Sequence, residues 1–112
     1  MKTLFITGTD TEVGKTVVAR ALLQSFTQAN ERAAGYKPVA RWGVKTEEGL
    51  RNKDGLFLQS ASSLALPYQA VNPVIFEKEE ICGYPPNKVD YAKITQGLQH
   101  LNQLADRVVV EG

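Results

Sequence analysis

The chain has 112 residues, enough for one small domain that would bury about two-thirds of its unfolded surface if it is complete. Its 13 Lys and Arg residues nearly balance its 12 Asp and Glu residues without long runs of either sign, so composition does not indicate nucleic acid or an anionic membrane as a partner. A single cysteine excludes an internal disulfide framework, and the lack of a signal peptide or an apolar span of about 18 residues favours a soluble, cytoplasmic protein.

The first predicted elements are a short strand and a helix joined by a glycine-bounded turn. Leu4, Phe5 and Ile6 form an apolar run typical of a buried parallel strand, and Gly8 ends it. From Lys15 to about residue 29, apolar residues recur at helical spacing, at Val17, Val18, Ala21, Leu22 and Phe26. We therefore expect the strand to lie inside a parallel sheet and Lys15 to lie at a helix N-terminus.

The turn between these elements has the residues of a phosphate-binding loop. A helix N-terminus offers unpaired N–H groups and about half a positive charge, to which Lys15 adds a full charge. Thr16 places a hydroxyl where this motif binds Mg²⁺, although five residues separate Gly8 from Gly14 instead of the usual four. The alternative is a Gly-Lys-Thr triplet that occurs by chance in a loop. The predicted nucleotide-binding residues are Gly8, Thr9, Asp10, Thr11, Glu12, Val13, Gly14, Lys15 and Thr16.

The segment of residues 33–39 predicts a second strand, which should end at Pro38 because proline cannot donate to a strand ladder. Lys37 would then lie at the carboxyl end of this strand. Two parallel neighbours joined by a helix have their carboxyl ends at one edge, so we expect Lys37 to face the same crevice as the phosphate loop. The alternative is an ordinary solvated lysine.

Residues 41–53 lack sustained periodicity and are predicted to form a long loop. Asp54 follows this loop, and its carboxylate has two possible roles. It can cap a helix that runs to about Ser60, or it can reach a metal ion near the phosphates. The local pattern leaves both roles open.

Residues 71–76 predict a short strand that Pro73 places at a sheet edge or at the start of the pairing. In the irregular segment 77–88, Cys82 has no partner at a metal-ligand spacing and is expected to be an inert thiol. Asp90 begins the last predicted helix, and His100 is expected on its surface beside an apolar stripe. The stripe consists of Tyr91, Ile94, Leu98, Leu101 and Ala105.

The last predicted strand, residues 107–110, contains three consecutive valines and is typical of a buried parallel strand. Glu111 follows it at the ligand edge, where such an acid holds a metal directly or through water in many phosphate-loop enzymes. The alternative is a polar strand end. Because the chain ends next to this strand, we also expect it to have an exposed edge that promotes self-association.

Residues 8–16 resemble the phosphate loop of the ATP-dependent dethiobiotin synthetases, including the five-residue spacing between the glycines. The partition and division-site ATPases share the expected fold, but their loops usually carry a second lysine where this chain has Thr9. The resemblance to the synthetases covers the whole chain through blocks that follow in the family's order, at residues 34–39, 48–54, 71–73 and 108–112.

This resemblance implies an α/β fold of the P-loop NTPase type, with a parallel sheet and helices on both faces, of which residues 1–112 would be the apparently truncated N-terminal part. It implies an ATP- and Mg²⁺-dependent cyclo-ligase of biotin synthesis, a cytoplasmic homodimer that closes the ureido ring of dethiobiotin from 7,8-diaminononanoate and CO₂. By the same resemblance, Lys15 and Lys37 supply positive charge to the γ-phosphate and the carbamate. Thr11 and Glu12 contact phosphate or the diamine. The implied Mg²⁺ ligands are Thr16, Asp54 and Glu111.

Departures from the family pattern favour a second hypothesis. Arg41 and Trp42 stand where the family usually has a small hydroxyl residue and a glycine at the substrate, and the segment 77–88 is shorter. The alternative is a catalytically inactive or switch-type nucleotide-binding protein related to the partition and division-site ATPases. We also expect that residues 1–112 do not turn over substrate by themselves, because the family's base pocket and dimer contact come from later strands.

Overall fold

The computed structural model describes residues 2–7, 12–77 and 90–112, with the side chains of Glu12 and Val13 outside that description. Its strands are β1 (Thr3–Ile6), β2 (Ala33–Tyr36), β3 (Val39–Thr46), β4 (Gly49–Arg51), β5 (Val74–Glu77) and β6 (Arg107–Glu111). Its helices are α1 (Glu12–Gln28), α2 (Lys53–Ala61), α3 (Tyr68–Val71) and α4 (Tyr91–Leu104). The predictions for Gly8, Thr9, Asp10 and Thr11, and for the segment that contains Cys82, lie outside the described residues.

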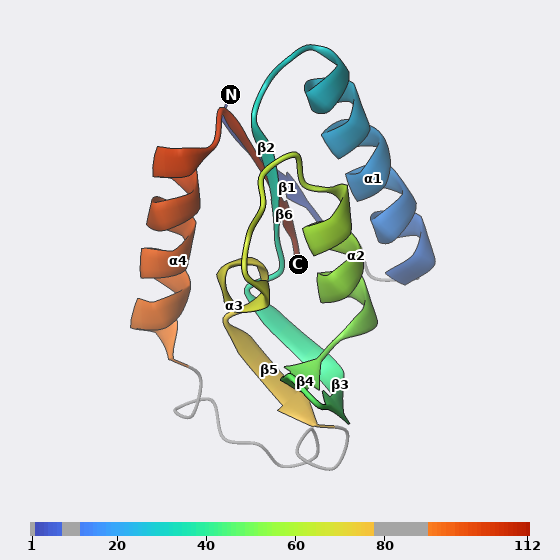
Figure 1. The fold of residues 1–112 in the computed structure, drawn as a ribbon, viewed down its shortest axis with the longest axis vertical. Helices are drawn as coiled ribbons and strands as arrows, with labels where there is room; N and C mark the ends of the chain where they lie inside the picture. Colours follow the sequence, from blue (N-terminus) through green and yellow to red (C-terminus); the bar gives the residue numbers. More distant parts are fainter. Residues whose placement is uncertain (1, 8–11, 78–89) are drawn as a thin grey trace.

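A parallel sheet with the strand order β1-β6-β2 forms the centre of the described fold (Figure 1). Thr3 of β1 and Ala34 of β2 both pair with Val108 of β6, so β6 separates the other two strands. The predicted parallel arrangement is confirmed, but β1 and β2 are not direct neighbours. The central position suits β6 because its three valines are buried.

Two expectations about the sheet edges are wrong. The sequence predicts β1 inside the sheet, whereas in the described residues it pairs with β6 only, and its Phe5 is 64% exposed. The sequence also predicts an exposed edge at residues 107–110, whereas β6 has a hydrogen-bonded neighbour on each side. Strand order depends on pairing between residues far apart in the chain, and local periodicity does not encode it.

Helices cover both faces of the sheet, as predicted. Figure 1 shows α4 on one side of the sheet and α1 with α2 on the other. Gly35 of β2 faces α2, where an added Cβ would lie 2.9 Å from the Leu58 Cβ, so the missing side chain lets α2 approach the strand. The next residue faces the other way, because the Tyr36 hydroxyl donates to the Ile94 carbonyl of α4 at 2.7 Å.

The hydrophobic core lies between the sheet and both helix layers. Its buried side chains include Leu23 of α1, Leu58 of α2, Leu101 of α4, and Val108, Val109 and Val110 of β6. Full burial of one such side chain contributes roughly 1.5–3 kcal/mol relative to exposure. The predicted apolar stripe of α4 holds at Leu98 and Leu101, but it is wrong at Tyr91, which is exposed. His100 lies on the exposed surface, as predicted.

A second, smaller sheet with the order β4-β3-β5 replaces most of the loop predicted for residues 41–53. β3 pairs with β5 in parallel and forms an antiparallel hairpin with β4, in which Gly49 adopts a φ of 119°. The loop prediction is wrong because β3 is mostly exposed, so its sequence lacks the alternation of a half-buried strand. Among the described strands β5 lies at an edge of this sheet, as Pro73 predicts.

Other element ends differ from the prediction by a few residues. α1 begins at Glu12 instead of Lys15, and β2 ends at Tyr36 instead of Pro38. The last helix begins after Asp90, whose carboxylate accepts from the Lys93 N–H at 3.0 Å as an N-cap, as predicted. No helix in the described part of the chain combines the length and the apolar character needed to cross a membrane.

Candidate functional site

The carboxyl end of β6 lies beside the N-terminal part of α1. Glu111 is the last residue of β6, and the N–H of the following Gly112 donates to the Ile6 carbonyl of β1 at 3.1 Å. The Lys15 ammonium of α1 donates to the Gly112 carbonyl oxygen at 2.7 Å. The strand that ends in the predicted metal-binding acid and the lysine of the predicted phosphate loop are therefore direct neighbours.

Lys37 and Glu111 form a buried ion pair at this edge. The Lys37 ammonium lies 3.6 Å from Glu111 Oε1, and the two side chains are 7% and 0% exposed. Burial raises the pKa of Glu111 above its ordinary value of 4.5, the charge of Lys37 opposes the rise, and the Asp54 carboxylate adds to it. Within the described residues neither carboxylate oxygen of Glu111 has a hydrogen-bond partner. Buried carboxylate oxygens without partners are costly, so this group is suited to bind a cation.

Asp54 is a second buried carboxylate that can accept a further hydrogen bond or bind a cation. Its Oδ1 accepts from the Thr16 hydroxyl at 3.4 Å, a weak contact, and its Oδ2 has no partner among the described residues. Because its charge acts on the pKa of Glu111, the two acids lie close enough to interact. The structure thus brings the predicted ligands Thr16, Asp54 and Glu111 into one region. Across the described ranges no group of three or more His, Cys, Asp or Glu residues is placed to hold a metal, since this set has two acids and one hydroxyl.

The N-cap residue of α2 is Asn52, and not Asp54 as one reading of the sequence predicts. The Asn52 side-chain oxygen accepts from the N–H groups of Asp54 and Gly55 at 2.9 and 3.1 Å, and α2 begins at Lys53. Asp54 lies in the first turn of α2, where its carboxylate also benefits from the positive end of the helix dipole. The capping role for Asp54 is therefore wrong, which leaves its carboxylate available for the metal role.

Arg41 and Trp42 lie in an irregularity of β3. The pairing register of β3 with β5 shifts between Ala40 and Gly43, so Arg41 and Trp42 lie at a bulge or irregularity of the pairing. Trp42 has a φ of 60°, in the left-handed region that non-glycine residues rarely adopt, and its side chain is half exposed. The two departures from the family pattern thus coincide with an unusual backbone segment.

The described site residues divide into those that sequence reasoning found and those that it missed. It found Lys15, Thr16, Lys37, Asp54 and Glu111, which the structure gathers at one edge of the main sheet. It missed the buried polar residues beneath that edge, Asn52, Tyr68 and Asn72. The available signal was an asparagine placed two residues before Asp54 and another placed before Pro73, because asparagine often caps helices and turns.

A parallel sheet with helices on both faces, and with cations, carboxylates and a helix N-terminus gathered at the carboxyl ends of its strands, defines an α/β domain of the nucleotide-binding class. The model of the AAA domain family matches residues 2–112 of the chain. The chain belongs to this family.

Curated relatives agree with the resemblance to the dethiobiotin synthetases. The chain is 53% identical over 112 residues to the ATP-dependent dethiobiotin synthetase BioD 2 of Escherichia coli (strain K12), covering all of this chain and 48% of the relative. It is 53% identical over 109 residues to the BioD 2 enzyme of Yersinia pestis, covering 97% of this chain and 49% of the relative. It is 46% identical over 112 residues to the BioD enzyme of Photobacterium profundum, covering 96% of this chain and 51% of the relative. The chain spans about half the length of the curated relatives it matches.

Proposed function

We propose that the protein to which this chain belongs is an ATP-dependent dethiobiotin synthetase. It would close the ureido ring of dethiobiotin from 7,8-diaminononanoate and CO₂, with ATP converted to ADP and phosphate. The observation that supports this most directly is the gathering of Lys15, Lys37 and two buried carboxylates at one sheet edge. The names of the curated relatives, which are close to half identical to the chain, support the same reaction.

The proposed reaction needs positive charge and fixed geometry more than it needs a protein nucleophile. One amine of the substrate adds to CO₂ and loses a proton to give a carbamate, and a carbamate oxygen then takes the γ-phosphoryl group from ATP. The second amine attacks the carbonyl carbon, and phosphate leaves as the ring closes and a proton is lost. Lys15 would stabilise the γ-phosphate, and Lys37 would stabilise the carbamate. Thr11 and Glu12 would contact phosphate or the diamine, within a nucleotide site formed by residues 8–16.

The residues of the site fit a Mg²⁺ ion. Thr16, Asp54 and Glu111 would hold it, because one hydroxyl and two carboxylates are oxygen ligands and three buried carboxylate oxygens lack hydrogen-bond partners among the described residues. When bound, Mg²⁺ would neutralise charge on the phosphates. The buried Lys37 ammonium would face the same acid and keep its charge close to the metal ligands.

The proposed partners follow from the reaction and from the balanced composition. They are the small-molecule substrates and a second copy of the protein, in a cytoplasmic homodimer that binds neither nucleic acid nor a membrane. A catalytically inactive or switch-type nucleotide-binding protein is the second candidate. It is favoured by Arg41 and Trp42, whose bulk replaces the small residues of the family and whose backbone at Trp42 is strained.

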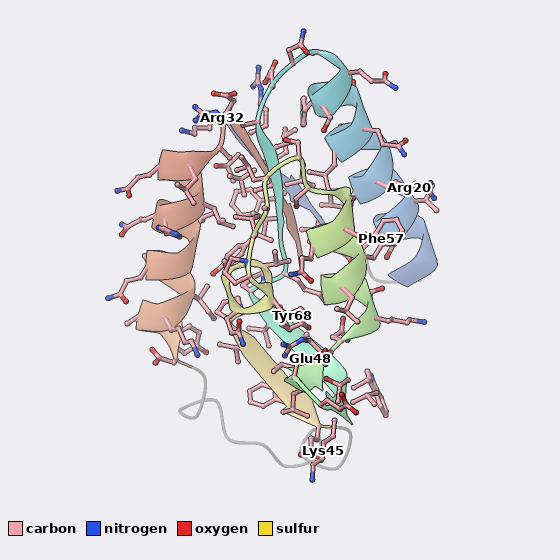
Figure 2. The ribbon with its side chains drawn as sticks, viewed as in Figure 1. Arg20, Arg32, Lys45, Glu48, Phe57 and Tyr68 are labelled. Carbon is pink, nitrogen blue, oxygen red and sulfur yellow. The ribbon has the colours of Figure 1, made fainter. Side chains whose placement is uncertain are left out.

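One assay on the protein in its natural full length separates the two candidates. ATP hydrolysis that depends on 7,8-diaminononanoate and bicarbonate would support the synthetase, and hydrolysis that responds only to a protein or DNA partner would support the switch. Lys37→Met should lower the diamine-dependent rate by roughly 100-fold or more, because an electrostatic contact to the reacting group is lost. Lys45→Met is the matched control, because the Lys45 side chain on β3 is 78% exposed and its ammonium lies 3.7 Å from a Glu77 carboxylate oxygen. Figure 2 shows Lys45 at the bottom of the view, at the end of the smaller sheet. A Lys37→Met rate equal to that of the control would contradict the proposal.

A further inference from the structure

Three buried polar side chains connect Lys37 to the N-terminus of α2. The Asn72 side-chain amide donates to the Lys37 carbonyl oxygen at 2.8 Å. The Tyr68 hydroxyl donates to the Asn72 side-chain oxygen at 2.7 Å and accepts from the Asn52 N–H at 2.8 Å. The Asn52 side-chain oxygen then accepts from the Asp54 N–H at 2.9 Å. One continuous chain of hydrogen bonds thus runs from Lys37 to Asp54, and we call it the Tyr68 network.

Every bond of the Tyr68 network has only one possible direction. The two N–H groups of the Asn72 amide face carbonyl oxygens of Lys37 and Val74, at 2.8 and 2.9 Å, so the other side-chain atom of Asn72 must be the oxygen. That oxygen cannot donate, so the Tyr68 hydroxyl must donate to it. The hydroxyl then accepts from the Asn52 N–H. A fully satisfied buried network of this kind specifies one arrangement of the elements that it joins.

The Tyr68 network connects residues that lie outside the strands of the main sheet, so strand pairing does not set their relative positions. Lys37 follows β2, whereas Asp54 belongs to α2, and Tyr68 comes from α3, which packs against both β2 and α2. The Lys37 N–H also donates to the Val71 carbonyl of α3 at 2.8 Å, so the Lys37 backbone is bound on both sides, by this short helix and by its C-cap residue Asn72. Figure 2 shows Tyr68 near the N-terminal end of α2, and its ring lies 4.5 Å from the Arg51 guanidinium.

We propose that Tyr68 is a positioning residue of the catalytic site, whose hydroxyl sets the placement of Lys37 relative to Asp54 through Asn72 and Asn52. This rests on the proposed function, in which Lys37 faces the carbamate and Asp54 binds the metal. Misplacement of such groups by as little as about 1 Å can lower a rate by roughly 100-fold while ground-state binding is retained. A positioning role therefore predicts a loss in kcat that exceeds any change in KM for ATP.

The test is Tyr68→Phe in the full-length protein, with Tyr36→Phe as the matched control. Both substitutions remove one hydroxyl from a buried tyrosine that donates at 2.7 Å, but the Tyr36 hydroxyl bonds the Ile94 carbonyl on the α4 side. We expect Tyr68→Phe to lower kcat of diamine-dependent hydrolysis roughly 10-fold or more with KM for ATP within about threefold, and Tyr36→Phe to keep kcat within about twofold. Equal losses of kcat in both variants would reflect general destabilisation and would overturn the positioning role.

Amide hydrogen exchange supplies a readout that does not depend on activity. Exchange of the Asn52 and Lys37 N–H groups should accelerate in Tyr68→Phe and stay unchanged in Tyr36→Phe, because only the first variant removes the acceptor of the Asn52 N–H. Unchanged exchange at both amides in Tyr68→Phe would overturn the inference. A parent protein without diamine-dependent hydrolysis would refute the proposed function, and the exchange result would still decide whether Tyr68 holds Lys37 and Asp54 together. If Tyr68→Phe does not fold, Gly55→Ala displaces the same hydroxyl without removing it, and the same two readouts apply.

Discussion

Gly55→Ala tests how firmly the Tyr68 network is held. Gly55 is the third residue of α2, and replacing a glycine by alanine inside an exposed helix usually stabilises it by about 1 kcal/mol. Here an added Cβ would lie 2.6 Å from the Tyr68 hydroxyl oxygen and 3.1 Å from two of its ring carbons. The tyrosine must therefore move, although it is 4% exposed and its hydroxyl makes two hydrogen bonds.

The expected result is a loss of stability in place of the usual gain. Forcing a methyl group into a packed site costs about 1–3 kcal/mol, and a weakened buried hydrogen bond costs about 1 kcal/mol. These terms exceed the gain in helix propensity, so Gly55→Ala should unfold with a free energy about 1–3 kcal/mol lower than that of the parent. The measurement is the urea midpoint at unchanged m-value in the full-length protein.

A double-mutant cycle with Tyr68→Phe identifies the cause of this loss. Without the hydroxyl oxygen the closest contact of the new methyl group disappears, so Gly55→Ala should cost at least about 1 kcal/mol less in the Tyr68→Phe background than in the parent. Effects that add within about 0.5 kcal/mol would refute the reasoning. They would mean that α2 shifts as a whole and that the Tyr68 hydroxyl keeps its place.

Lys15→Ala should weaken ATP binding by roughly 10- to 100-fold in calorimetry, because a charge-assisted contact is lost; Lys93→Ala on the exposed side of α4 is the control, and equal affinities of the two variants would contradict the phosphate role. The pKa of Glu111 is raised above 4.5 by burial, so its favourable contribution to metal-free stability is present below pH 4.5 and is lost as pH rises through the raised pKa. The stability of Glu111→Gln relative to the parent should therefore rise from pH 4 to pH 8 in urea titrations, because the variant lacks the titrating carboxyl; a difference independent of pH would count against this. Hydrogen bonds from Arg32 lower the pKa of Asp106 below 3.8, so their contribution is present above pH 3.8 and is lost as pH falls below it. Asp106→Asn should lower the urea midpoint at pH 7 by an amount that shrinks as pH falls below 3.8, and a shift independent of pH would exclude the ion pair as its cause.

The sequence determined the parts of this protein that depend on neighbours along the chain. Three successive valines required a strand buried on both faces, and the helical spacing after Lys15 required a helix that begins near the predicted phosphate loop. Parallel strands have their carboxyl ends at one edge, so the sequence also placed Lys37 and Glu111 near each other before any distance was known. Local pattern and sheet geometry were sufficient for a parallel sheet with Lys15, Lys37 and Glu111 at one edge, whereas the metal role of Asp54 came only from the resemblance to the dethiobiotin synthetases.

Only the tertiary structure decided which distant segments became neighbours. It placed β6 between β1 and β2, and it paired the exposed strand β3 with β5. Strand pairing depends on contacts between residues far apart in the chain, and local hydrophobic periodicity does not encode these contacts. It also chose between Asn52 and Asp54 as the cap of α2, since both side chains can accept from the first N–H groups of a helix. The choice of Asn52 followed from the Tyr68 hydroxyl and the Arg41 carbonyl, which bind the Asn52 N–H and side-chain amide and hold Asn52 at the helix entrance. The carboxylate of Asp54 was thereby left with an oxygen that no described residue binds.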